Sequence, residues 1–161
     1  DLPSFESFLC KWKNTGPLIL NLKSEGLEDK CIELMNKHQI VNWFFLDMSM
    51  PFFVKYAIKS QSGLVQYFSP ENLAVRFSDF EPIEYALSFE KSVQWVWVDT
   101  FNNFPLTPDT YKQLKESQFK LCLVSPELQG LPIENIIIIK RLVKDFEIDA
   151  VCTKHPELWK E

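Results

Sequence analysis

The fold is decided by the stretch Gln94-Trp-Val-Trp-Val-Asp99, a short apolar run that ends in a carboxylate. Five other runs of the same kind recur along the chain, at Pro17–Lys23, Val41–Asp47, Leu73–Ser78, Phe119–Ser125 and Asp149–Lys154. Each interval between them is long enough for one helix and two loops. This rhythm predicts βαβ units on a parallel sheet, with a helix first and then six strands alternating with five helices.

Helix signals fall in the intervals. Ser4 and Thr107-Pro108 are typical of helix starts, because Ser and Thr cap a helix and proline suits its first turn. We expect the last long helix to cover Ile133–Phe146. Its run Ile136–Ile139 is apolar on several faces, which favours a place between neighbouring elements.

Composition limits the function classes. The 161 residues suffice for one domain, expected to span residues 1–161. The net charge of −5 and pI of about 5.1 argue against a nucleic-acid partner. No apolar run approaches the roughly 20 residues of a membrane span, so no transmembrane segment is expected. The four cysteines form no CxxC pair, which favours reduced thiols and a cytoplasmic location.

Function is expected where the strands end, because parallel sheets carry their chemistry at the carboxyl ends of the strands. Cationic, acidic and hydroxyl side chains follow these strands or lie in the adjoining loops: Lys23, Asp47, Arg76, Ser78, Glu81, Asp99, Ser125, Glu127 and Lys154. Lys and Arg would hold a phosphorylated or acidic ligand, and the carboxylates would serve a metal or proton transfer. The alternative is salt bridging between neighbouring strand ends.

Aromatic side chains accompany these polar residues. Trp95 and Trp97 alternate with Asp99, so all three are expected on one face of the strand. They form either a stacking platform for a ligand or part of the core. The chain has no glycine-rich phosphate loop and no GxSxG elbow, which argues against an α/β-hydrolase. Six units fit a doubly wound sheet or part of a (β/α)8 barrel.

Three segments resemble the glycerophosphodiester phosphodiesterase family, within the PLC-like phosphodiesterase superfamily of TIM barrels. Leu2-Pro-Ser-Phe-Glu-Ser-Phe-Leu9 is similar to the helix before the third strand, and Leu18-Ile-Leu-Asn-Leu-Lys23 to that strand. Asp149-Ala-Val-Cys-Thr-Lys-His-Pro-Glu-Leu158 is similar to the eighth strand and its loop. The resemblance implies a partial TIM-barrel-like α/β fold in this chain, with six βα units and without the first two strands. A fragment of a longer barrel is therefore expected.

The resemblance also implies a site. Lys23 would contact the phosphate of a glycerophosphodiester as the catalytic residue, and Asn21 stands where the family has a metal-binding Glu. A divalent metal, Ca²⁺ or Mg²⁺, is implied. The family's acid/base histidines and Glu-x-Asp ligands belong to the two absent strands. We therefore expect metal-assisted cleavage by the full-length form, or else an inactive barrel that binds a phosphorylated or sugar-like ligand. Substrate contacts are expected from Arg76, Glu81, Trp97, Asp99, Phe101 and Glu127.

Overall fold

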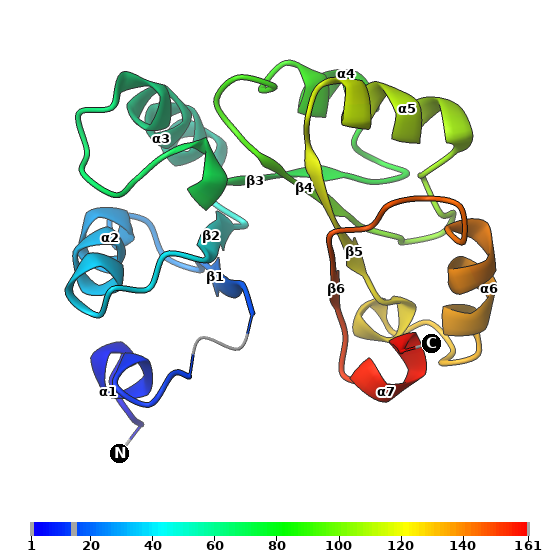
Figure 1. Ribbon diagram of the computed structural model, residues 1–161, viewed down its shortest axis with the longest axis horizontal. Helices are drawn as coiled ribbons and strands as arrows, with labels where there is room; N and C mark the ends of the chain where they lie inside the picture. Colours follow the sequence, from blue (N-terminus) through cyan, green and yellow to red (C-terminus); the bar gives the residue numbers. More distant parts are fainter. Residues whose placement is uncertain (1, 14–15, 161) are drawn as a thin grey trace. The chain divides into compact units, whose positions relative to one another are not determined.

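The structure is a computed structural model, and it describes residues 2–13 and 16–160. All six expected strands are present, and each lies inside its apolar run (Figure 1). They are β1 (Leu18–Asn21), β2 (Trp43–Leu46), β3 (Ala74–Phe77), β4 (Trp95–Val98), β5 (Lys120–Val124) and β6 (Ala150–Cys152).

The alternation of strands and helices is also confirmed. One helix lies between each pair of successive strands: α2 (Glu28–Lys37), α3 (Met50–Ser62), α4 (Ile83–Leu87), α5 (Pro108–Glu116) and α6 (Asn135–Leu142). Helix α1 (Phe5–Leu9) precedes the strands and α7 (Pro156–Trp159) follows them. Two 3₁₀ turns, η1 (Pro70–Asn72) and η2 (Pro126–Gln129), complete the described elements.

The chain divides into two compact units. The first unit comprises residues 1–74 and 91–93, and the second comprises residues 75–90 and 94–161. Residues 1 and 161, the ends of the expected single domain, lie outside the described residues. A single domain over residues 1–161 therefore stays a prediction, and each unit is considered below by itself.

The first unit is built on the parallel pair β1 and β2, in which Leu20 lies opposite Phe45. Phe45 is fully buried, and its ring centroid lies 4.9 Å from that of Trp43 and 6.4 Å from that of Tyr56 on α3. An isolated parallel bridge also joins Phe45 to Leu73, the residue before β3. All four residues of β2 are apolar and buried, and Phe45 packs against Tyr56 of α3.

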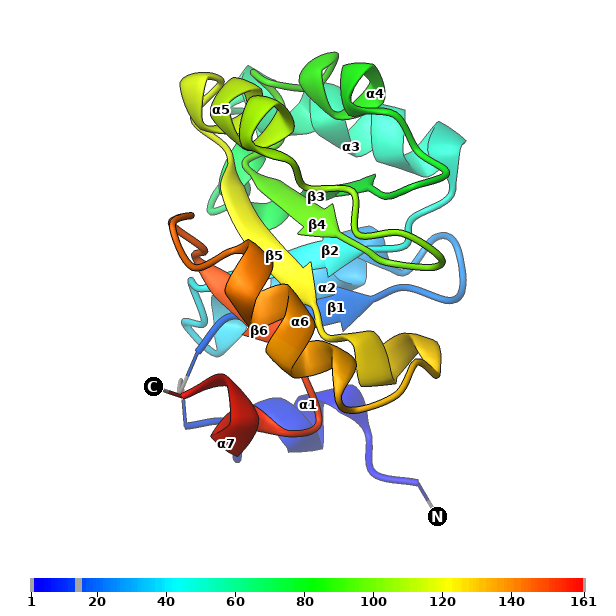
Figure 2. The same cartoon turned by 90° about the vertical axis from the view of Figure 1, so that its right-hand side faces the viewer.

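The second unit contains a four-stranded parallel sheet in the order β3-β4-β5-β6. Because parallel crossovers are right-handed, a sheet traversed in one direction carries its connecting helices on a single face. Figures 1 and 2 show α5 and α6 on the same side of this sheet. A doubly wound sheet reverses its strand order and carries helices on both faces. These four strands show no reversal.

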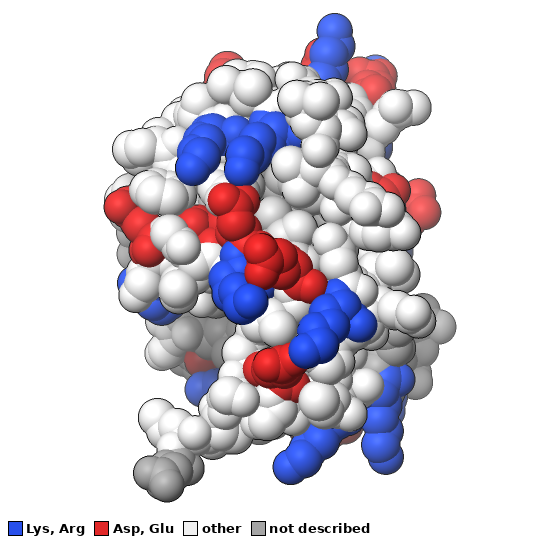
Figure 3. Space-filling model, turned by 90° about the vertical axis from the view of Figure 1, so that its left-hand side faces the viewer, with Lys and Arg blue, Asp and Glu red and all other residues white. Residues whose placement is uncertain are grey.

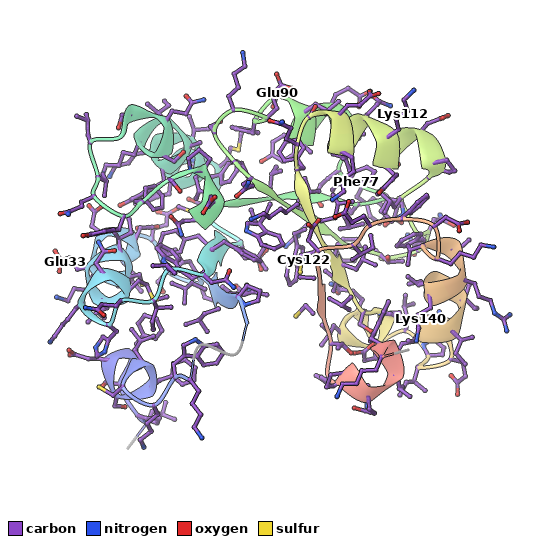
Figure 4. The ribbon with its side chains drawn as sticks, viewed as in Figure 1. Glu33, Phe77, Glu90, Lys112, Cys122 and Lys140 are labelled. Atoms are coloured by element: carbon purple, nitrogen blue, oxygen red, sulfur yellow. The ribbon has the colours of Figure 1, made fainter. Side chains whose placement is uncertain are left out.

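The two faces of the second unit's sheet differ in character. Register places Trp97 beside Cys122 and Cys122 beside Ala150, so these residues share a face with Trp95. The other face is aliphatic, with Val96, Val98, Leu121, Leu123 and Val151. Figure 4 shows Phe77 and Cys122 on the strands, whereas Lys112 and Lys140 project outward from the helices. The alternation expected for Trp95, Trp97 and Asp99 is consistent with this register.

One expectation about the last long helix is wrong. Helix α6 ends at Leu142 rather than continuing to Phe146. Within its isoleucine run, Ile136 and Ile139 are buried, but Ile137 and Ile138 are 57% and 54% exposed. The run is therefore not packed on several faces. Only the positions three residues apart turn inward, as helical periodicity requires.

Helices α2 and α5 end in the same way. The N–H of Ile40 donates to the carbonyl of Met35, and that of Phe119 donates to Leu114. The residue before each donor, Gln39 or Gln118, has a positive φ of 55° or 62°. This is the Schellman arrangement, in which a left-handed residue is followed by an apolar one. It delivers the chain directly into β2 and β5.

The cysteines are all free thiols. Cys10 is exposed, Cys31 and Cys152 are half-buried, and Cys122 is buried. Burial raises the pKa of Cys31, Cys122 and Cys152 above that of an ordinary thiol.

No helix among the described residues is both long and apolar enough to cross a membrane. The face of the first unit in Figure 3 carries acidic and basic side chains side by side. Several are paired, as in Lys59 with Asp29 at 3.0 Å and Lys30 with Glu33 at 3.0 Å. Mixed charges of this kind form a solvated helix surface.

Candidate functional site

A hollow of about 310 Å³ lies at the carboxyl ends of β1 and β2 in the first unit. It is lined by the residues that follow the two strands and by the start of α2: Leu22, Lys23, Ser24, Glu25, Glu28, Asp47, Met48 and Ser49. This is the edge of a parallel sheet where ligand sites are usual. Because Ser49 is also the N-cap of α3, the first turn of that helix begins at the hollow.

Lys23 and Asn21 meet at one carboxylate. Lys23 Nζ lies 2.8 Å from Oδ2 of Asp47, and Asn21 Nδ2 donates to the same oxygen at 3.0 Å. The Lys23 side chain is 73% exposed. Asp47 has a φ of 59°, a left-handed conformation that Asp tolerates better than most residues. The predicted phosphate-contacting lysine thus lies at a pocket, and its partner carboxylate comes from the neighbouring strand.

The charge of the hollow is dominated by carboxylates. Its lining residues comprise one cation, Lys23, and three acidic residues, Glu25, Glu28 and Asp47. Only 1% of Glu28 is exposed. Its Oε2 accepts a hydrogen bond from Gly26 N at 2.9 Å. An anionic ligand would therefore have to compete with Asp47 for Lys23.

One polar group at the start of α3 belongs to the lining of the hollow. Ser49 Oγ is a buried atom with no hydrogen-bond partner among the described residues, and it does not cap the helix. The N–H groups in the first turn of a helix attract oxyanions, but Pro51 in α3 has no N–H and the N–H of Phe53 donates to the carbonyl of Ser49. Lys23 is exposed at this hollow and can donate to the oxygens of a phosphate ester, and the Ser49 hydroxyl lies in the wall. Ser49 was not predicted from the sequence, because no residue pattern indicates that a hydroxyl group will lack a hydrogen-bond partner.

The second unit brings four of the predicted residues together. Arg76 Nε lies 3.9 Å from Oε2 of Glu81 and 3.8 Å from Oδ2 of Asp99. Ser78 Oγ donates to Glu81 Oε2 at 2.7 Å. Neighbouring strand ends therefore pair with each other here, which is the alternative that the sequence left open for these residues.

Asp99 is 1% exposed and is held from several sides. Its Oδ1 accepts hydrogen bonds from Gln129 Nε2 at 2.7 Å and from Thr100 N at 3.1 Å. Gln129, at the end of η2, was not foreseen, because its contact joins residues 30 positions apart. Asp99 is thus a buried, hydrogen-bonded carboxylate, and a role in contacting substrate stays a prediction.

Glu127 belongs to a second network that joins the ends of β5 and β6. Its Oε1 accepts from Thr153 Oγ1 at 2.6 Å and from Lys154 N at 3.0 Å, and Ser125 Oγ also donates to its carboxylate. Burial alone would raise the pKa of Glu127, but the donors from Ser125, Thr153 and Lys154 N outweigh burial and lower the pKa to about 2. The Glu127 carboxylate thus links the ends of β5 and β6, and we call this arrangement the clamp.

The predicted aromatic residues lie in different surroundings. Trp97 is 6% exposed on β4. Phe101 has its ring centroid 6.0 Å from that of Phe80, which is 69% exposed. The Phe101 N–H donates to Asp79, as do the N–H groups of the next two residues. Burial acts to raise the pKa of Asp79, but these three donors lower it. Of the two rings, only Phe101 lies in a loop after a strand end.

No model of a known protein family matches the chain, and no curated protein matches it. The functional assignment therefore depends on the residues and geometry described above and on the resemblance of the three segments.

A metal centre has little support at this pocket. Among the described residues, no group of three or more His, Cys, Asp or Glu side chains is placed to hold a metal ion. Calcium takes six to eight oxygen ligands, whereas Asn21 turns its amide nitrogen toward Asp47. These residues do not by themselves fit a Ca²⁺ or Mg²⁺ centre, so no metal-dependent step follows from them. The divalent metal stays a prediction from the resemblance.

Proposed function

We propose that the chain is a glycerophosphodiester phosphodiesterase-like barrel and that the hollow at the ends of β1 and β2 receives the phosphate of its ligand. The observation that carries the proposal is the position of Lys23: its side chain is 73% exposed at a hollow of about 310 Å³ where helix α3 begins. An exposed ammonium group is a strong donor to the oxygens of a phosphate ester.

The arrangement of strands supports the barrel part of the proposal. Within the second unit the strands follow one another in chain order, with α5 and α6 on one face. In the first unit, β2 is followed by a bridge to Leu73, just before β3. A flavodoxin-like order would instead place β1 beside the third strand. Sequential order with helices on one face is the arrangement of a (β/α)8 barrel.

Lys23 is free to change partners. Its contact with Asp47 is made by a mostly exposed lysine, and exposed ion pairs of this kind contribute only about 0.2–1 kcal/mol. A phosphate with two charged oxygens offers Lys23 a stronger partner. Ligand binding would therefore move the Lys23 ammonium from Asp47 to the phosphate, leaving Asp47 bonded to Asn21.

Two versions of the function differ in whether the ligand is cleaved. Cleavage needs an acid/base group beside the phosphate, and the family that the chain resembles uses histidines for this role. His38 caps the end of α2 and His155 precedes α7, and neither lines this hollow. Within residues 2–13 and 16–160, the geometry thus favours phosphate binding. Metal-assisted cleavage by the full-length form is the other version, and it needs residues beyond those described.

The test compares Lys23→Ala with Lys30→Ala in the full chain. Lys30 is a matched control, because it is 68% exposed on α2 and pairs with Glu33. We expect calorimetry with glycerol 3-phosphate and glycerophosphocholine to show binding that falls about tenfold in Lys23→Ala and stays unchanged in Lys30→Ala. Phosphorus NMR of glycerophosphocholine, with and without Ca²⁺, separates cleavage from binding. Equal binding by the two variants would contradict the proposal.

A further inference from the structure

A second hollow, of about 640 Å³, lies at the opposite end of β2 in the first unit. It is lined by the end of α2, by Gln39 and the two residues that follow it, and by the loop that connects α3 to η1. Figure 1 shows this loop beside α2. The volume lies in the range of small-molecule sites, about 300–1,000 Å³. The amino ends of barrel strands usually serve stability, so a hollow of this size there calls for an explanation.

The wall of this hollow is held in place by internal hydrogen bonds. Asn36 Nδ2 on α2 donates to the carbonyl of Gln66 in the loop at 3.2 Å. Asn72 Nδ2 donates to the carbonyl of Trp43 at 3.0 Å, and its Oδ1 accepts from Ser69 N at 3.0 Å. Both ends of the loop are thereby tied to α2 and β2. The site is therefore largely formed before a ligand binds, and binding would order few additional residues.

The lining is almost free of charge. Glu71 is the one charged side chain among the lining residues, and no Lys or Arg is among them. Gln39 and Gln66 present side-chain amides that make no hydrogen bond to any other described residue. Buried Phe68 and Met35 provide an apolar floor. This chemistry is unsuited to a phosphate, and it suits an uncharged ligand that both stacks and forms hydrogen bonds.

Tyr67 is the unusual residue of the wall. It has a φ of 58° and is 68% exposed. It occupies the third position of a turn closed by a hydrogen bond from Phe68 N to the carbonyl of Val65 at 3.2 Å. A positive φ at that position favours glycine, and an aromatic residue there is strained. Strain of this kind occurs at ligand-binding walls, where a side chain is needed in spite of its backbone cost.

From these observations we propose that the second hollow binds an uncharged planar heterocycle of nucleoside size. The ring of Tyr67 stacks on the heterocycle. The amides of Gln39 and Gln66, each with an acceptor and two donors, pair with its edge. The inference is independent of the phosphate site proposed for Lys23, because the two hollows share no lining residue.

The experiment distinguishes the contribution of the Tyr67 ring to ligand binding from the effect of its strained backbone on stability. In Tyr67→Gly the strained turn gains its preferred residue, so the variant should melt no lower than the natural chain. Gln118→Gly is the matched control, because Gln118 has a similar φ of 62° and lies outside the hollow. The probes are adenosine, guanosine, cytidine and uridine, measured by calorimetry and by ¹H–¹⁵N NMR of the full chain.

We expect at least one nucleoside to bind, with amide shifts centred on residues 63–72. Loss of a stacking ring should weaken binding about tenfold or more in Tyr67→Gly, whereas Tyr67→Phe and Gln118→Gly should bind normally. The corresponding 5′-monophosphate should bind no more tightly than the nucleoside, because the lining offers no cation. The inference is overturned if no nucleoside binds at millimolar concentration, if Tyr67→Gly binds as well as the natural chain, or if the shifts centre on Lys23.

Discussion

Lys23 Nζ lies 2.8 Å from Oδ2 of Asp47, so a cation after β1 and a carboxylate after β2 neutralise each other across a parallel pair of strands. The pair holds the ammonium in place at the hollow, but it also competes with any anion that approaches. The strength of phosphate binding should therefore depend on Asp47 as much as on Lys23.

Asp47→Asn tests this competition. Asparagine adopts the φ of 59° at this position as readily as aspartate does, so the fold should be preserved. Removing one negative charge beside Lys23 should strengthen binding of glycerol 3-phosphate on the order of three- to tenfold, as measured by calorimetry at low salt. Weaker binding in Asp47→Asn would mean that Asp47 itself contributes to the ligand site, for example through a metal.

The lowered pKa of Glu127 predicts that the folded chain loses stability at acid pH. Its pKa is about 2 in the folded chain, below the ordinary value of 4.5, so its hydrogen bonds stabilise the fold fully above about pH 4.5. That contribution is lost progressively as the pH falls from 4.5 toward 2. Glu127→Gln should lower the free energy of unfolding by about 1–3 kcal/mol at pH 7, as measured in urea. The difference in the free energy of unfolding between Glu127→Gln and the natural chain should be smaller at pH 3 than at pH 7. A difference that does not change with pH would argue against the clamp.

Asp99 and Gln129 should behave as one unit. Gln129→Ala removes the 2.7 Å donor to a carboxylate that is 1% exposed, and we expect a loss of about 1–3 kcal/mol in stability. Asp99→Asn keeps an oxygen that can accept from Gln129 but removes the charge that faces Arg76, so we expect a cost of similar size. The double variant should cost less than the sum of the two single changes, by about 0.5 kcal/mol or more in a double-mutant cycle. Simple additivity would show that the two residues act independently.

Gln118→Gly should stabilise the second unit. The left-handed φ of 62° costs a non-glycine residue about 1–2 kcal/mol, part of which glycine loses again through its greater freedom in the unfolded chain. The expected net gain is about 0.5–1 kcal/mol in the free energy of unfolding, measured by denaturant titration. Gln118→Ala, which keeps the strain, serves as the control and should show no gain.

The sequence was most informative where one local pattern dominates. All six strands lie within their apolar runs, because a short, continuous apolar run bounded by polar residues is typical of a buried strand. Helix starts at Ser4 and Thr107 were predicted for an equally local reason: both side chains accept a backbone N–H three residues later. The predicted end of the last long helix, Phe146, was wrong, because four successive isoleucines do not show by themselves which of them face the core.

The candidate site was predictable only in part. The positions of Lys23, Arg76, Asp99 and Glu127 at strand ends follow from the βα rhythm. Their partners do not, because Gln129 reaches Asp99 and Thr153 reaches Glu127 over about 30 and 26 residues of chain. Pairing between distant loops is set by tertiary packing, which a single sequence does not display. The hollow beside Tyr67 was missed for the same reason.

The four free thiols differ enough to be distinguished chemically. Thiolates, not thiols, react with maleimides, and burial both shields Cys122 and raises the pKa of Cys31, Cys122 and Cys152, which lowers their thiolate fraction. Cys10 is exposed at the end of α1 and lines neither hollow. A fluorescent maleimide should therefore attach to Cys10 first, giving a labelled protein in which both proposed binding sites can be titrated without altering any residue of either one.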